Sequence, residues 1–207
     1  CRPVNEDTAE LITAGLKEQL PSVDAIVVAD YGKGVVTQGL MDGIRRLTRD
    51  SKVVLAVDPK VQNLALYRDV TFVTPNHKEA QDMSGIVIED EASLKRAGDR
   101  LLQELGCQMV LITRGEKGMA LFERNGQTTQ IPTVARKVFD VSGAGDTVIS
   151  TFTLALAAGL TPRQAAVLAN FAAGLVVSEV GTATVSGARL KHALLNGMPE
   201  MGMDEIE

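Results

Sequence analysis

Residues 24–30 read Asp-Ala-Ile-Val-Val-Ala-Asp, a short apolar run between two acidic residues. Such a run predicts a buried strand of a parallel sheet, because parallel strands are usually covered on both faces. Residues 37–49 follow with apolar side chains at helical spacing, and residues 53–57, Val-Val-Leu-Ala-Val, predict a second buried strand. Strand, helix and strand in this order indicate a parallel α/β unit.

The same alternation continues along the chain. Further strands are predicted at 70–73 and 109–113, and helices at 76–83, 91–105, 147–158, 161–177 and 186–196. Asn125-Gly126 separates two short segments, 118–123 and 127–132, and predicts a hairpin. Residues 198–207 indicate a frayed acidic tail. We therefore predict an α/β fold with three layers, αβα, in which helices cover both faces of a mostly parallel sheet.

Composition and charge narrow the class of protein. With 207 residues and 45% hydrophobic content, the chain is most simply one domain with one substantial core. A net charge of −5 and few aromatic residues argue against nucleic-acid binding. The apolar run 148–160 is interrupted by hydroxyl residues and is too short to span a bilayer, and no signal peptide is visible. Cys1 and Cys107 lie far apart without metal-type spacing, so a reduced, cytoplasmic location is expected.

A glycine motif stands directly before the apolar segment that begins at Thr147. Residues 140–146 read Asp-Val-Ser-Gly-Ala-Gly-Asp. The start of a helix has unpaired N–H groups and the positive end of the helix dipole, and Gly143 and Gly145 let a phosphate approach the backbone closely. The motif therefore predicts a phosphate site. Asp146 is the candidate base that accepts the proton of a substrate hydroxyl as it attacks the γ-phosphoryl group of a nucleotide.

An ordinary helix cap is the alternative interpretation of this motif. In that case Ser142 is the N-cap, the glycines form the turn, and Asp146 lies in the first helical turn, where negative charge is favourable. Short glycine motifs also match by chance. A second acid, Asp140, and the further candidates below favour the phosphate site.

Asn76 and Glu79 begin a predicted helix and have two interpretations that can both hold. At this spacing they form a capping box, with Asn76 as N-cap and Glu79 at the third helical position. They are also suited to lie near a hydrated Mg²⁺ that bridges nucleotide phosphates, because Mg²⁺ keeps several waters and needs few protein ligands.

Other candidates follow the ends of predicted strands. Asp30, Asp58, Asn76 and Arg114 lie at these ends, where parallel sheets bind their ligands. Thr113 and Gly115 are placed to line a nucleotide, and Arg114 to donate to phosphate, unless residues 113–118 are only a solvated turn. Lys33 and Lys60 add positive charge at two strand ends, although each alone is more often an exposed charge.

Taken together, these residues resemble the ribokinase-like carbohydrate kinase family, in which Gly143-Ala144-Gly145-Asp146 corresponds to the C-terminal signature. Six blocks in order are most similar to the kinase domain of the bifunctional heptose enzymes of lipopolysaccharide-core synthesis. The blocks are Asp30-Tyr31-x-Lys33-Gly34, Asp58-Pro59-Lys60, Thr74-Pro75-Asn76, Thr113-Arg114, the run 140–149 and the run 181–186. The resemblance covers nearly the whole chain.

The resemblance implies an activity and a set of roles. The reaction is ATP-dependent phosphorylation of the anomeric hydroxyl of D-glycero-D-manno-heptose 7-phosphate. Asp146 corresponds to the catalytic base and residues 143–146 to the anion hole. Asn76 and Glu79 correspond to the Asn-x-x-Glu motif associated with Mg²⁺, and Thr113 and Gly115 to nucleotide contacts. Asn170 falls where the family lines the adenine pocket, and Lys33 and Lys60 are the candidate substrate contacts. Asp140, Ser142 and the loop at Gly181 resemble a monovalent-cation site, for K⁺.

The chain also departs from this family. The family's N-terminal strand, its sugar-binding Gly-Gly motif and its small β-sheet lid do not precede Cys1, and no nucleotidyltransferase domain follows Glu207. The resemblance therefore implies that residues 1–207 are the C-terminal, ATP-side part of a kinase domain, with little sugar kinase activity alone. A homodimer of the full-length protein is a further expectation. Two other functions stay open: a related kinase for another sugar or a nucleoside, and a nucleotide-binding module without chemistry.

Overall fold

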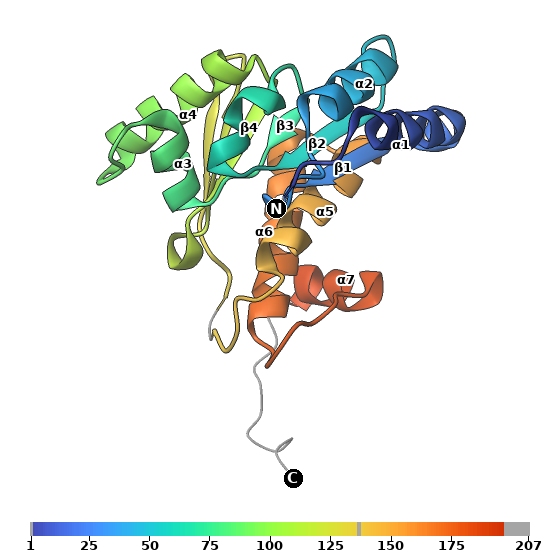
Figure 1. Cartoon of the computed structure of the whole chain (residues 1–207). Coiled ribbons are helices and arrows are strands. Elements are labelled where there is room, and N and C mark those ends of the chain that lie inside the picture. Colours follow the sequence, from blue (N-terminus) through green and yellow to red (C-terminus); the bar gives the residue numbers. More distant parts are fainter. Residues whose placement is uncertain (1, 136–137, 197–207) are drawn as a thin grey trace.

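The structure is a computed structural model, and it describes residues 2–135 and 138–196 (Figure 1). The strands are β1 Ala25–Ala29, β2 Val54–Asp58, β3 Phe72–Val73, β4 Met109–Thr113, β5 Met119–Glu123 and β6 Thr128–Ile131. The α-helices are α1 Glu6–Gln19, α2 Gln38–Thr48, α3 His77–Ser84, α4 Glu91–Leu105, α5 Ala144–Ala157, α6 Pro162–Val177 and α7 Gly187–Asn196. A 3₁₀ segment, Val61–Tyr67, connects β2 to β3.

The strands form one sheet whose spatial order is the order of the sequence, β1-β2-β3-β4-β5-β6. Strands β1 to β4 pair in parallel, and β5 and β6 add an antiparallel hairpin. The predicted mostly parallel α/β sheet is therefore confirmed. Since the carboxyl ends of β1 to β4 share one edge of the sheet, the loops that follow these strands lie side by side there.

Alternating side chains along the strands divide the core into two parts, because successive residues of a strand face opposite sides. Leu55 and Val57 of β2 pack in the cluster that contains α2 and α4, whereas Ala56 packs in the cluster that contains α5 and α6. On the second face, Phe72 of β3 meets Phe152 of α5 edge to face, with ring centroids 4.7 Å apart.

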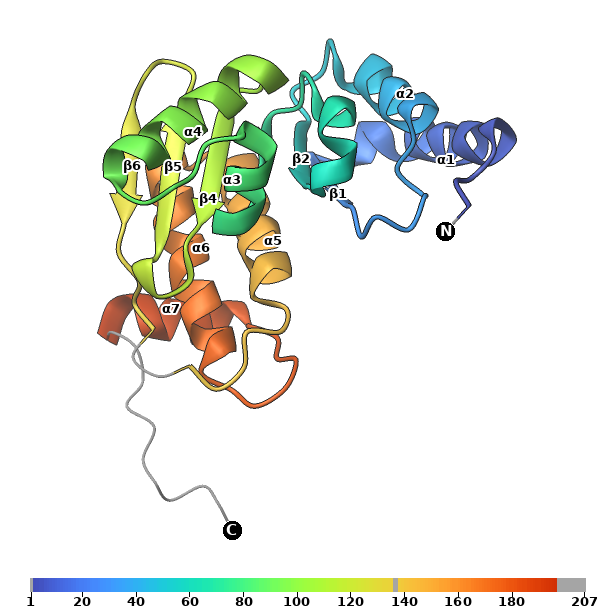
Figure 2. The ribbon, with the colours of Figure 1, turned by 60° about the vertical axis from the view of Figure 1, so that its left-hand side comes forward.

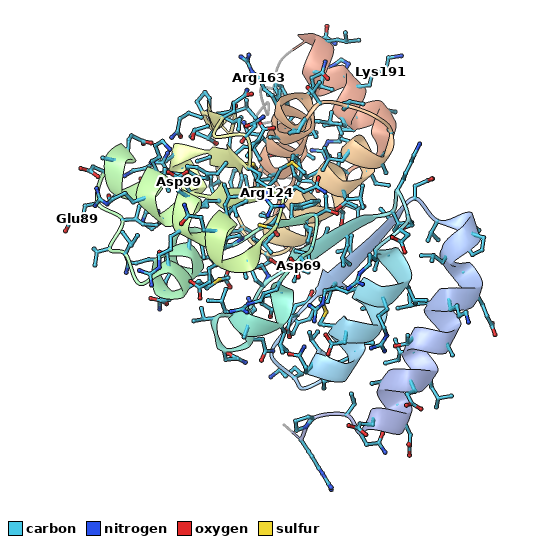
Figure 3. The ribbon with its side chains drawn as sticks, turned by 90° about the horizontal axis from the view of Figure 1, so that it is seen from above. Asp69, Glu89, Asp99, Arg124, Arg163 and Lys191 are labelled. Atoms are coloured by element: carbon cyan, nitrogen blue, oxygen red, sulfur yellow. The ribbon has the colours of Figure 1, made fainter. Side chains whose placement is uncertain are left out.

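The views agree with this division. Helices α1 to α4 lie on one side of the sheet and α5 and α6 on the other (Figures 1 and 2). The view from above shows α1, α2 and α4 across the first face, with α1 outermost (Figure 3). Among residues 2–135 and 138–196, no helix is both long enough and apolar enough to cross a bilayer.

Strand β1 differs from its prediction as a buried strand. Only Val28 is buried among its residues, and the Val27 side chain is 41% exposed. The reason is that β1 is an edge strand of the described sheet, so helices cover it incompletely. Helix boundaries agree to different degrees: α4 begins and ends at the predicted residues, whereas α5 begins at Ala144, three residues before its predicted start. The predicted tail at 198–207 lies outside the described residues.

Candidate functional site

The glycine motif forms the start of α5, but Ser142 is not its N-cap. The N-cap is Gly143, which has φ +78° and provides no side-chain cap. Only glycine adopts this left-handed backbone at little cost, which explains the residue at this position. The N–H groups of Gly145 and Asp146 have no acceptor among the described residues. The start of α5 is therefore open to an anion.

Asp140 and the Gly181 loop lie beside this helix start. The Asp140 carboxylate accepts a hydrogen bond from Ser142 N at 2.8 Å. Hydrogen bonds from the Ser142 backbone and side chain hold the pKa of Asp140 below its usual value. A Cβ on Gly143 would meet the Thr182 methyl at 3.4 Å, so the 181–186 loop contacts the motif directly. The structure thus brings together the two segments assigned to the cation site, the run 140–146 and the 181–186 loop.

Tyr31 reaches Asp146 from the loop that follows β1. Its hydroxyl lies 3.2 Å from one Asp146 carboxylate oxygen and 3.4 Å from the other. The negative charge of Asp146 raises the pKa of Tyr31, so the phenol stays a donor. Although these residues are far apart in the sequence, they meet because the β1 loop and the start of α5 share one edge of the sheet.

Asp58 ends β2 between these groups. The pKa of this carboxyl is raised to about 6: burial is the main cause, the charges of Glu79 and Asp146 add to it, and the charge of Lys60 opposes it. The Thr74 hydroxyl donates to Asp58 at 3.4 Å. The end of β2 is therefore electrostatically coupled both to the start of α5 and to the start of α3.

Lys60 and Glu79 form the other side of the site. Lys60 Nζ lies 2.7 Å from Glu79 Oε1, and this hydrogen bond raises the pKa of Lys60. Glu79 Oε2 accepts from Asn76 N at 3.0 Å, and Asn76 Oδ1 accepts from Glu79 N at 2.9 Å. The predicted capping box is confirmed. It fixes the Glu79 carboxylate at the edge where the strands end.

The residues after β4 divide into two groups. Thr113 bridges to Asn76 in parallel fashion, so it lies beside the start of α3, and Gly115 has open space where a Cβ would point. The Arg114 guanidinium instead bonds Glu91 at 2.7 Å and Gln130 at 2.9 Å. With only 7% of its side chain exposed, it joins α4 to β6, and its Nε is buried without a hydrogen-bond partner among the described residues.

Asn170 and Lys33 lie apart from the residues that meet at the starts of α5 and α3. The Asn170 side chain is 4% exposed, and its amide donates to the Pro132 carbonyl at 2.7 Å, which ties α6 to the segment after β6. Lys33 is exposed in the β1 loop. No described contact joins either residue to Asp146 or Glu79.

The carboxylates of the site do not form a metal cage. Within the part of the chain that the structure describes, no three His, Cys, Asp or Glu side chains are grouped so as to hold a metal ion. Glu79 alone, with its oxygens fixed by Lys60 and Asn76, fits a hydrated Mg²⁺ that takes most of its ligands from water and phosphates. A separate hollow of about 1040 Å³ lies at the amino ends of β2 and β3 and is lined by Arg45, Arg49 and Lys52 among others. None of the candidate site residues lines it.

Sequence reasoning missed one contact of the site and left one residue without a role. In the sequence, Tyr31 stands out only as part of the block Asp30-Tyr31-x-Lys33-Gly34, and Asp58 only as an acid at the end of a predicted strand. The signal for Asp58 is its position at the end of β2, two residues before Lys60. Nothing in the sequence indicated that the Tyr31 hydroxyl reaches Asp146, because that contact depends on how the β1 loop turns.

Comparison with known proteins supplies the family. The model for the family described as "pfkB family carbohydrate kinase" matches residues 4–188. The chain is 46% identical over 191 residues to the bifunctional protein HldE of Desulfatibacillum aliphaticivorans, and 48% identical over 188 residues to that of Geobacter metallireducens. These alignments cover 92% and 91% of this chain but 39% and 38% of the relatives. The chain therefore spans about two fifths of the length of the curated relatives it matches.

Solved structures show the same fold at low sequence identity. Ribokinase from Giardia lamblia has a TM-score of 0.77 at 19% identity, with 93% of this chain and 64% of that chain covered. Phosphofructokinase-2 from Escherichia coli, in complex with potassium, has a TM-score of 0.75 at 19% identity, covering 91% and 62%. These likenesses confirm the ribokinase-like fold class.

Proposed function

We propose that this chain, which belongs to the pfkB family of carbohydrate kinases, is the ATP-side part of a kinase domain that phosphorylates a sugar hydroxyl. The observation that carries the proposal is the meeting of two features at the start of α5. One is a helix start whose N–H groups at Gly145 and Asp146 have no acceptor among the described residues. The other is the Asp146 carboxylate in the same turn, 3.2 Å from Tyr31.

This arrangement suits phosphoryl transfer. The N–H groups and the helix dipole stabilise the negative charge of the migrating phosphoryl group. Asp146 accepts the proton of the attacking hydroxyl and aligns its oxygen with the phosphorus. Because the transition state is loose, alignment and charge neutralisation matter more than high basicity of the carboxylate.

The nucleotide side of the proposal uses the neighbouring loops. Thr113 and Gly115 line ATP, and Glu79, with Asn76, holds a hydrated Mg²⁺ that neutralises the phosphate charge. We propose that Asn170 lines the adenine pocket and that Arg114 contacts the nucleotide. Asp140, Ser142 and the Gly181 loop are proposed to bind K⁺, a proposal supported by their direct proximity to Gly143.

For the acceptor we propose D-glycero-D-manno-heptose 7-phosphate, phosphorylated at its anomeric hydroxyl. The support is the identity of 46% and 48% to proteins named HldE over nine tenths of this chain. Lys60 and Lys33 follow β2 and β1 and supply positive charge for a sugar that already carries a phosphate. We also propose that the reaction takes place in the cytoplasm and that the complete protein is a homodimer.

The test is Asp146→Asn in the complete natural protein. We expect turnover to fall by roughly 10²–10⁴-fold, because a positioned base contributes about this much. ATP binding, measured by calorimetry, should remain nearly unchanged. Asp7→Asn is the matched control, because Asp7 is also in the first turn of a helix, α1, and therefore interacts with the helix dipole in the same way. Unchanged turnover in Asp146→Asn would eliminate this mechanism, and a wild-type protein that binds ATP but phosphorylates no acceptor would leave the nucleotide-binding module as the better account.

A panel of acceptors separates the sugar proposals. The heptose 7-phosphate should give the highest kcat/KM, above ribose, fructose 6-phosphate and a nucleoside. A higher value for any of these assigns the chain to a related kinase instead. Residues 1–207 alone should bind ATP but turn over little, because substrate positioning supplies much of the catalysis. Robust turnover by residues 1–207 contradicts that expectation.

A further inference from the structure

Asp30 is a buried carboxylate that the proposed chemistry does not use. Only 2% of the residue is exposed, and its oxygens accept three hydrogen bonds: from Gly32 N at 2.7 Å, from Asn63 Nδ2 at 2.7 Å and from the Tyr67 hydroxyl at 2.6 Å. A buried carboxylate needs such donors, since burial without them is costly. Asp30 therefore anchors the chain rather than reacting.

The Tyr67 hydroxyl is the centre of this anchor. The residue is fully buried at 0% exposure, and its ring packs in the core beneath α2 and α4. Its hydroxyl donates to Asp30 and accepts from Lys60 N at 3.0 Å. The hydroxyl thus joins two loops, the one after β1 and the one after β2. A phenylalanine at this position would fill the same space in the core but would lack the hydroxyl that bonds the two loops.

Each of the two joined loops carries one side of the candidate site. The first turns at Gly32, φ +65°, and holds Tyr31 against Asp146. A Cβ on Gly32 would lie 2.3 Å from the Gln62 amide, so this loop presses closely on the Val61–Tyr67 segment. The second loop holds Lys60 against Glu79. The Tyr67 hydroxyl therefore lies between the two loops that carry the two sides of the site.

We propose that Tyr67 and Asp30 are positioning residues: their buried hydrogen bond sets the placement of Tyr31 beside Asp146 relative to Lys60 beside Glu79. This inference rests on the proposed kinase function for its effect on the reaction. The link itself is a property of the fold and is measured separately. Transfer between two bound substrates depends strongly on such placement, since a misplacement of about 1 Å costs about a hundredfold in rate.

The experiment compares Tyr67→Phe with Ser93→Ala in the complete natural protein. Ser93 is a matched control because it is also a buried hydroxyl bonded to a carboxylate, Asp90, but it caps α4 away from the site. We expect Tyr67→Phe to lower kcat by about tenfold or more, with the KM for ATP changed less than about twofold. Ser93→Ala should lose comparable thermal stability and keep its kcat.

A double-mutant cycle distinguishes positioning from general loosening. Tyr67→Phe and Tyr31→Phe should be non-additive, because the first acts through the loop that carries the second. The proposal is overturned if Tyr67→Phe has the same kcat as the wild type, or if Ser93→Ala lowers kcat as much as Tyr67→Phe does. It is also overturned if the effects of Tyr67→Phe and Tyr31→Phe on kcat simply multiply.

Amide hydrogen exchange tests the link without any assay of activity. In residues 1–207, Tyr67→Phe should speed exchange at the amides of Lys60 and Gly32, while the Ser93 amide, bonded to Asp90, keeps its protection. Unchanged exchange at Lys60 overturns the link. If exchange changes but the wild-type protein phosphorylates no sugar, the proposed function fails and the link remains as a structural feature only.

Discussion

At the scale of single residues, Asp58 is a carboxyl group whose ionisation is opposed by its burial. Its carboxyl has a pKa of about 6 instead of 3.8, chiefly because it is buried. The folded chain therefore binds this proton more tightly than the unfolded chain does. Between about pH 4 and pH 6 the folded state holds more protons, so stability from this group falls as the pH rises through that window.

Asp58→Asn should remove this penalty, because the amide is neutral at every pH. We expect the variant to gain stability relative to the wild type at pH 7.5 and to gain little at pH 4.5. Urea unfolding followed by circular dichroism at both pH values measures the difference. An equal loss at both values would mean that the hydrogen bond from Thr74, rather than charge, dominates at this position.

The residues of the candidate site were only partly predictable at this scale. Asn76 and Glu79 follow from a local rule, since a capping box involves residues three apart. The open start of α5 was also predicted, although its N-cap is Gly143 and not Ser142, because φ +78° is a property of the turn and not of the side chain. The bonds of Arg114 to Glu91 and Gln130 and the contact of Tyr31 with Asp146 join distant segments, which no local pattern reveals.

At the scale of elements, two helical glycines have opposite surroundings. A Cβ on Gly98 of α4 would lie 2.5 Å from the Phe122 ring of β5, so this glycine lets the helix approach the sheet closely. A Cβ on Gly15 of α1 would have no atom within 4 Å. Sequence periodicity predicted α4 accurately but could not distinguish a glycine in a tight contact from one facing solvent.

Gly98→Ala should therefore destabilise the chain by about 1–3 kcal/mol, because overpacking moves an aromatic ring in a close-packed core. Gly15→Ala should instead stabilise it by up to about 1 kcal/mol, since alanine is the better helix former. The midpoints of urea unfolding measure both, and each variant is the control for the other. A gain in stability from Gly98→Ala would mean that the sheet moves freely away from α4.

At the scale of the whole molecule, the sheet has an apolar edge at β1. The strand pairs only with β2 among the described residues, and Val27 is 41% exposed. The sequence predicted which segments are strands, but not which of them is at the edge. That depends on the pairing of all the strands together, and an apolar run looks alike in an edge strand and in a central one.

Such an edge favours pairing with another chain, and lysine is a common protection against it. We expect residues 1–207 to self-associate at high concentration, and Val27→Lys to reduce this association. Sedimentation velocity over a concentration series measures it. Val35→Lys is the control, because Val35 is 50% exposed but lies in the loop after β1. Equal reduction by both variants would point to general charge repulsion and not to the edge.

The coincidence of spatial and chain order in the sheet also has a consequence for synthesis on the ribosome. Each strand emerges next to the one made before it, so the sheet can assemble as the chain grows. Its second face, with Phe72 and Leu111, has no cover until α5 and α6 are made. At ordinary rates of translation that delay is on the order of seconds. During this interval one hydrophobic face of the nascent sheet is accessible to chaperones.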